Sequence, residues 1–221
     1  MSQTLSHPAT RTISATRALL GLGVAAGPVY VTVALAQALT REGFDLVRHP
    51  WSFLANGDLG WIQTANFAVT ALATIACAVG LRRALSPGRG ARWAPRLVGA
   101  FGASMIGAAV FPADPAMGFP AGTPEGPGVV TTSGMLHMAV GGVGFLCMVA
   151  ACFAVAARFA AEGRGGWAVY SRVTGVLFLG AFLGIATGGG VAWANLAFVA
   201  GIVAIWTWLS LVSRDLARTA A

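Results

Sequence analysis

The sequence predicts an all-α polytopic membrane protein, a bundle of six transmembrane helices with both termini cytoplasmic. The first observation is composition: 57% of the 221 residues are hydrophobic and only 10% are charged, whereas soluble domains average about 25% charged residues. The second is that the apolar residues form runs of the length, about 20 residues, that a helix needs to cross a bilayer. The third is the one-sided placement of arginine. Together they exclude an ordinary soluble domain and a disordered chain.

The six spans form a single domain, residues 18–212, between two short cytoplasmic tails, residues 1–17 (expected to be flexible) and 213–221. Gly23 and Gly27, in the first span, have the four-residue spacing that lets two membrane helices approach closely. The apolar stretch 173–212 is too long for one helix, and glycines at 188–190 divide it into the last two spans. The spans are predicted at about 18–39, 60–81, 94–111, 134–157, 172–187 and 191–212.

The arginines predict the orientation. With a cytoplasmic N-terminus, twelve of the fourteen arginines fall in the tails and in the connections 82–96 and 158–172, and only Arg41 and Arg48 fall outside. Cytoplasmic connections carry such an excess of basic residues, which predicts that both termini are cytoplasmic. The expected membrane is the bacterial cytoplasmic membrane. The net charge of +7 is therefore a topology signal, and no nucleic-acid partner is expected. Membrane lipids are the expected partners, and no oligomeric state is predicted.

A second interpretation of the first span is a secretory signal peptide. Arg11 and Arg17 precede an apolar run that reaches Ala34-Leu35-Ala36, which resembles a cleavage site. Against cleavage, the leading polar segment is long and the apolar run continues beyond the site. Cleavage would leave five spans and place the new N-terminus outside.

Most polar side chains that could do chemistry lie on the predicted outer side, with five of the seven acids and two of the three histidines. The first outer connection is expected to form a short interfacial helix beginning near Pro50. Trp51 and Trp61 would fix its depth at the headgroups. This connection is either an anchor without a site or the rim of a polar pocket on the outer face. The pocket would be lined by Asp45, Arg48, His49, Ser52, Asn56, Asp58, Gln63, Asn66, Asp114 and His137.

The second span carries a polar stripe, because Gln63, Asn66, Thr70 and Thr74 are spaced to share one helical face. An amide in hydrocarbon is costly unless it is hydrogen-bonded, so this face must turn inward. It either bonds to a neighbouring helix or lines the pocket.

Asp114 and His137 are the residues most suited to act as a pair. Pro112 and Pro115 end the third span around Asp114, and His137 lies about one turn into the fourth span from the same side. A hydrogen bond between them would hold the connection in place. With His49 or Asp58 they could instead bind a divalent metal such as zinc. No metal-binding motif is present, so no cofactor is predicted and a metal stays a weakly supported candidate.

The run from Arg48 to Gln63 resembles a signature of a prokaryotic multi-pass family catalogued as domain of unknown function 998. Asn66-Phe67, the segment 111–120 and Leu136-His137 are similar to the same family, and the resemblance covers most of the chain. It implies a six-helix membrane protein and supplies no reaction.

Three classes of function fit these residues. The first is a binding, sensing or accessory protein for lipid or a small ligand, in which Arg48 would contact an anionic group such as a phosphate. The second is a small-solute transporter, which a faint similarity between the segments before the second and fifth spans would favour as an inverted repeat. The third is a metal-dependent hydrolase acting on lipid. Motifs for nucleotides, haem or a serine nucleophile are absent from the sequence, and we lean away from an enzyme.

Overall fold

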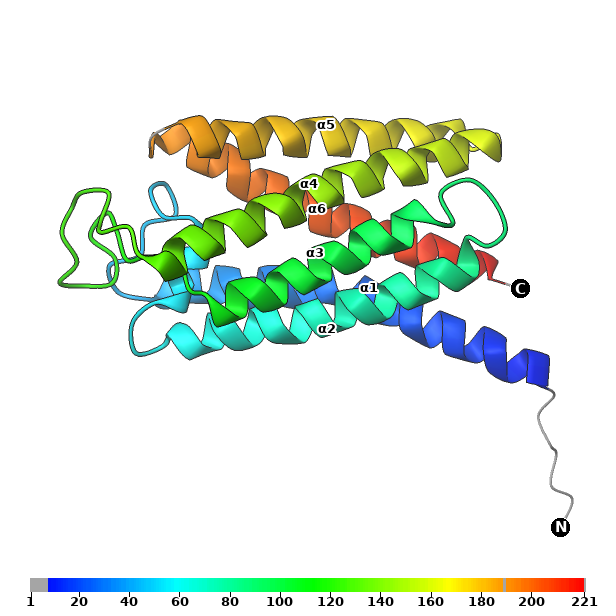
Figure 1. Cartoon of the computed structure of the whole chain (residues 1–221), viewed down its shortest axis with the longest axis horizontal. Helices are drawn as coiled ribbons and strands as arrows, with labels where there is room; N and C mark the ends of the chain where they lie inside the picture. The colour runs from blue at the N-terminus through cyan, green and yellow to red at the C-terminus, as the bar shows by residue number, and fades with distance from the viewer. Residues whose placement is uncertain (1–7, 189, 221) are drawn as a thin grey trace, which may run out of the picture.

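The computed structural model describes residues 8–188 and 190–220 (Figure 1). Within them the chain forms six α-helices, one short 3-10 helix and no named strand, which confirms the predicted all-α class. The 3-10 helix, η1 (Trp51–Ala55), lies between α1 and α2. The α-helices are α1 (Pro8–Thr40), α2 (Gly60–Ala84), α3 (Trp93–Val110), α4 (Thr132–Ala161), α5 (Gly165–Thr187) and α6 (Ala192–Thr219).

Five of the six helices, all except α3, are long and apolar enough to cross a membrane. Such a set of helices is typical of a multi-pass membrane protein. α3 has 18 residues, and Pro95 and Arg96 near its start reduce its apolar character. It packs between α2 and α4, and at about 1.5 Å per residue it is about 27 Å long.

The helices are longer than predicted at both ends of the chain. α1 begins at Pro8, so residues 8–17 of the predicted flexible tail are helical. Proline suits the first helical turn, and the following residues up to Gly21 include no glycine or proline that would break the helix. Residues 1–7, with His7, lie outside the described residues. α6 likewise continues to Thr219 because arginine, leucine and alanine favour helix beyond the apolar run.

The six helices form a closed ring, in which each packs on the next and α6 packs on α1. Glycines of α1 allow close contacts in this ring. A Cβ atom at Gly27 would lie 2.6 Å from Ser210 Oγ and 2.9 Å from the Trp206 carbonyl oxygen, and one at Gly23 would collide with Cys77 Sγ. The predicted close-approach role of the two glycines is confirmed.

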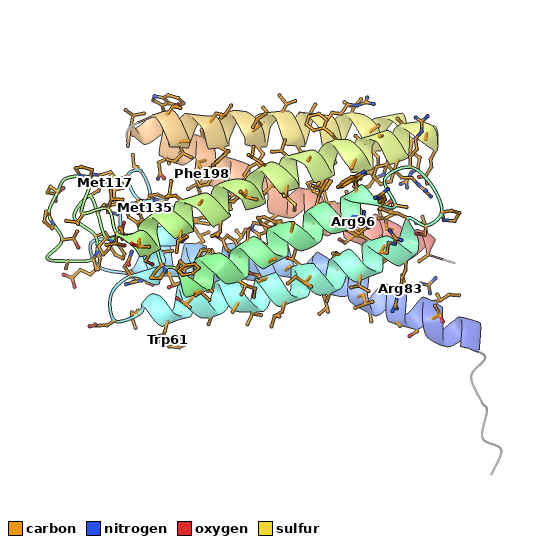
Figure 2. All side chains as sticks on the ribbon, in the orientation of Figure 1. Trp61, Arg83, Arg96, Met117, Met135 and Phe198 are labelled. Atoms are coloured by element: carbon orange, nitrogen blue, oxygen red, sulfur yellow. The ribbon has the colours of Figure 1, made fainter. Side chains whose placement is uncertain are left out.

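The connections alternate between two ends of the bundle (Figure 1). The cap end carries residues 41–59 and 111–131, and the terminal end carries both described chain ends. Arg17 Nη2 donates to the Ala220 carbonyl oxygen at 2.8 Å, which ties α1 to the end of α6. Figure 2 shows Arg83 and Arg96 at the terminal end, opposite Trp61 and Met117. The separation of the arginines by end follows from the fold, and their cytoplasmic placement stays a prediction.

An ion-pair network joins the α4–α5 connection to α6 at the terminal end. Arg164 Nη2 donates to Asp215 Oδ1 at 2.6 Å, and Glu162 lies between Arg164 and Arg158. The hydrogen bond with Asp215 raises the pKa of the Arg164 guanidinium above its usual value. Arg158 also donates to the Leu85 carbonyl oxygen at 2.9 Å, so the network reaches the α2–α3 connection as well.

Candidate functional site

The cap is the structure in which two connections pack together, residues 41–59 and 111–131. Arg41 contacts both of these segments. The Arg41 guanidinium donates to the carbonyl oxygens of Leu54 and Asn56, each at 2.6 Å. It also lies 4.9 Å from the centroid of the Phe119 ring, which belongs to the second segment of the cap. Partial burial lowers the pKa of Arg41, and the nearby charge of Asp58 opposes that shift. Arg41 therefore connects η1 to both segments.

His49 is a structural residue of the cap, with a side chain only 2% exposed. The backbone N–H of Asp45 donates to Nδ1 at 2.9 Å, so Nδ1 must be the acceptor nitrogen. Nε2 then donates to the Met117 carbonyl oxygen, also at 2.9 Å. Met117 is the one described non-glycine residue with a positive φ, 55°. With both nitrogens occupied, His49 holds the two cap segments together.

Asn195, at the start of α6, attaches the cap to the helices. Its side chain is fully buried, and Nδ2 donates to the carbonyl oxygens of Leu46 at 2.9 Å and His49 at 3.3 Å. Sequence reasoning missed this residue. The signal was available, because an amide within an apolar span needs a partner, which is the same reasoning that selected Gln63 and Asn66.

Asp114 and His137 both hold the α3–α4 connection, through different partners. The Asp114 carboxylate accepts from the backbone N–H and the hydroxyl of Thr131, at 2.8 and 2.6 Å. Thr131 in turn caps α4 by accepting from Gly134 N at 3.1 Å. His137 Nδ1 donates to the Phe111 carbonyl oxygen at 2.8 Å. Within the described residues, no hydrogen bond joins Asp114 to His137.

The polar face of α2 turns toward α1. Gln63 Oε1 accepts from Gln37 Nε2 at 3.0 Å and from Asn66 Nδ2 at 3.3 Å, and Asn66 also donates to the Tyr30 carbonyl oxygen. Thr70 and Thr74 donate to carbonyl oxygens within α2. All four residues of the predicted stripe are at most 5% exposed. Gln63 and Asn66 thus bond to α1 and the two threonines bond within α2, and Gln37 is a partner that sequence reasoning missed.

A cavity of about 160 Å³ lies inside the ring, lined by residues of all six helices and roofed by η1. Its lining is mainly aromatic and aliphatic. Phe101 and Trp206 pack edge to face with ring centroids 5.5 Å apart, and Tyr30 stacks on Trp206 at 5.2 Å. The lining includes few polar side chains, among them Ser52, Ser104 and His137. Three residues selected from the sequence line it: Trp51, Ser52 and His137.

This cavity differs from the polar outer pocket expected from the sequence. The other eight predicted lining residues lie elsewhere: Asp45, Arg48, His49, Asn56, Asp58, Gln63, Asn66 and Asp114. The cap or α1 engages most of them, Arg48 forms an exposed pair with Glu125 at 2.8 Å, and Asp58 is on the surface. Most residues expected in the outer pocket are thus engaged within the cap or with α1 and do not line this cavity.

The two tryptophans expected as interfacial anchors occupy different environments. Trp61 is 67% exposed at the start of α2, as an interfacial ring would be. Trp51 is only 5% exposed and lies in the roof of the cavity, with its ring centroid 6.2 Å from that of Tyr30. η1 turns Trp51 inward because Arg41 holds the end of this helix down on the bundle.

The structure does not gather the candidate metal ligands. In residues 8–188 and 190–220, no three side chains of His, Cys, Asp or Glu lie together as a metal-binding group. His49 and His137 each hydrogen-bond a backbone carbonyl oxygen, Asp114 bonds Thr131, and Asp58 is exposed.

A family model described as "Protein of unknown function (DUF998)" matches residues 24–215. This match covers nearly all of the helical bundle and the whole cap, and it confirms the resemblance carried by the residues around Arg48 and Asp114. No curated protein and no solved structure matches the chain.

Proposed function

We propose that this chain, which belongs to the DUF998 family, is a membrane protein that binds an apolar ligand in its central cavity. The observation that carries the proposal is the lining of the cavity, to which every helix of the ring contributes. Ligand sites are concave, mostly apolar and supplied with a few polar groups. A space left by poor packing would not be expected to collect nine aromatic rings from six helices and η1 around itself.

The size of the cavity limits the ligand. Apolar cavities of about 150 Å³ stay dry and bind benzene-sized molecules. The central cavity, at about 160 Å³, therefore holds about six carbon atoms, either as a ring or as part of a chain.

Ligand binding is favoured over transport and hydrolysis because the polar side chains are already engaged in hydrogen bonds within the fold. A transport path needs polar side chains that face a continuous hydrated space, and the polar face of α2 is instead bonded to α1 or to its own helix. A metal-dependent hydrolase needs gathered ligands, and the described residues bring no such group together.

The proposal also includes the orientation of the helical bundle in the membrane. The terminal end carries twelve of the fourteen arginines, which supports a cytoplasmic terminal end and a cap on the outer face of a bacterial cytoplasmic membrane. The alternation of the connections between the two ends supports six crossings, with α3 included.

Filling the cavity from Gly141 is expected to abolish binding. Gly141 lines the cavity, and no atom lies within 4 Å of a Cβ built there, so Gly141→Phe places its ring in open space at the cavity wall. In the native protein, benzene at ten times its Kd should stabilise the fold by about 1.4 kcal/mol, about 3–6 °C in Tm. Gly141→Phe should show no such shift in thermal unfolding of the purified protein.

Gly180→Phe is the matched control. Gly180 also lies in a membrane-crossing helix with no atom within 4 Å of its Cβ, but it is exposed and does not line the cavity. This variant should keep the native shift, and benzene dissolved in the detergent affects all three proteins alike. An equal shift in Gly141→Phe, or none in the native protein, contradicts the proposed function.

A further inference from the structure

The cavity has a side opening between α4 and α5. Most lining residues from α1, α2 and α3, including Tyr30, Phe67 and Met105, are at most 6% exposed, so the wall on that side is closed. The exposed lining residues belong to the opposite side: Met138 of α4 is 67% exposed, and Ala186 of α5 is exposed. α4 and α5 lie together near their connection and separate toward the cap end (Figure 1).

An aromatic contact marks the inner edge of this opening. The rings of Phe145 and Phe182 meet edge to face with centroids 5.4 Å apart, and a Cβ on Gly142 would lie 3.6 Å from Phe182. On the cap side of this contact, a Cβ atom built at Gly141 would have no atom of another residue within 4 Å. The mouth therefore lies between Phe182 and the cap. Figure 2 shows Met135 and Phe198 at this end of the bundle.

The surroundings of the mouth are apolar. Met135, Met138 and Leu183 are at least 50% exposed on α4 and α5, two helices long and apolar enough to cross a membrane. Met138 lies six residues after the start of α4, or about 9 Å along the helix. This depth places the mouth in the hydrocarbon of the leaflet at the cap end.

The folded cap obstructs the route from the cap surface, although Pro50, Ser52 and Phe53 of the lining are half-buried. Trp51 roofs the cavity and is buried, and the cap above it is held by Arg41, His49 and Asn195. A ligand from water would have to break these contacts, whereas a lipid chain already lies against the mouth.

We propose that the ligand is an acyl chain of a membrane phospholipid, which enters sideways between α4 and α5 from the leaflet at the cap end. This inference rests on the proposed function and names its ligand. The chain lies with its methyl end in the cavity, toward Phe101 and Trp206, and its ester end outside the mouth, on the cap side of Met138. Phe145 lies 13 residues into α4, so the cavity extends about 20 Å from the cap end. This depth is about half the thickness of a bilayer with its headgroup regions, so it reaches the methyl ends of the chains in that leaflet.

The cavity holds only part of such a chain. About six carbon atoms fit within 160 Å³, fewer than a phospholipid chain contains. The remainder stays in the mouth between Met138 and Ala186, so the bound lipid keeps its headgroup at the membrane surface.

Photolabelling in a bilayer tests this inference. The full chain is reconstituted in liposomes of phosphatidylglycerol that carries a diazirine either near the methyl end or near the ester of one acyl chain. After irradiation, mass spectrometry maps the labelled residues. The methyl-end probe should label Phe101 and Trp206, and the ester-end probe should label Met135 and Met138, which are exposed beside the mouth. Exposed residues of α2, such as Leu72, serve as the reference for contact with bulk lipid.

The two glycine variants complete the test. Gly141→Phe should reduce labelling of Phe101 and Trp206 at least tenfold while labelling of Leu72 is unchanged, and Gly180→Phe should match the native protein. Labels confined to exposed surfaces, or an unchanged Gly141→Phe pattern, overturn the acyl-chain inference. If benzene still binds in that case, the proposed function stands and only the lipid assignment falls. If neither benzene nor lipid reaches the cavity, both fall.

Discussion

Replacing Gly27 by valine is expected to lower the free energy of unfolding by about 3 kcal/mol. The new Cβ would lie 2.9 Å from the Trp206 carbonyl oxygen, a backbone atom of α6 that can move only if the whole helix moves. α1 and α6 would separate at the contact that closes the ring. Tyr30 and Trp206, which lie beside this contact, also line the cavity, so benzene binding should weaken as well. Thermal unfolding of the purified protein with and without benzene measures both effects.

Gly21→Val is the control for this prediction. Gly21 lies in the same helix, and no atom lies within 4 Å of a Cβ built there. Valine has a somewhat better helix propensity than glycine, so the expected change is less than about 0.5 kcal/mol. Equal losses in the two variants would show that backbone flexibility of α1, rather than its approach to α6, sets the stability.

Arg41→Met should cost about 3 kcal/mol and loosen the cap. Methionine keeps much of the apolar stem but donates no hydrogen bond, so the carbonyl oxygens of Leu54 and Asn56 lose their partner at about 1–3 kcal/mol each. The cation over the Phe119 ring is lost as well. Hydrogen exchange should rise in residues 41–59 while α2 keeps its protection. Thermal unfolding gives the loss of stability.

Arg48→Met provides the comparison within the same connection. Arg48 pairs with Glu125, and their side chains are 44% and 77% exposed, so water screens the pair. The expected loss is at most about 0.5 kcal/mol. If Arg48→Met destabilises the cap as much as Arg41→Met does, the hydrogen bonds from Arg41 to the Leu54 and Asn56 carbonyl oxygens are not what stabilises the cap.

Several parts of the site could be recognised from residue type alone. Gln63 and Asn66 stand out because amides are rare and costly in an apolar span, and the structure gives them partners in α1. Asn195 carries the same signal. Arg41 does not, because an arginine in a connection is usually solvated, and its role depends on carbonyl oxygens thirteen and fifteen residues further along the chain.

The hydrogen-bond partner of a polar residue is harder to predict from the sequence than the part of the fold that the residue holds in place. Asp114 and His137 are expected to form a hydrogen bond, whereas the Asp114 carboxylate bonds Thr131, the N-cap residue of α4. Both arrangements hold the same connection. Spacing along the chain could place Asp114 and His137 at one end of the bundle, but the choice between two hydrogen-bond donors depends on distances of a few ångströms.

The number of helices, their class and the separation of the arginines follow from hydropathy and charge. A bilayer acts on each segment separately through its thickness and its lack of water, so local composition is enough to predict them. The cavity does not follow in this way, because it is the space left between six packed helices. Tyr30 and Trp206 stack at 5.2 Å although 176 positions separate them in the sequence. Such a contact exists only after Gly27 lets α6 close the ring, and the packing then makes the interior apolar and opens it between α4 and α5.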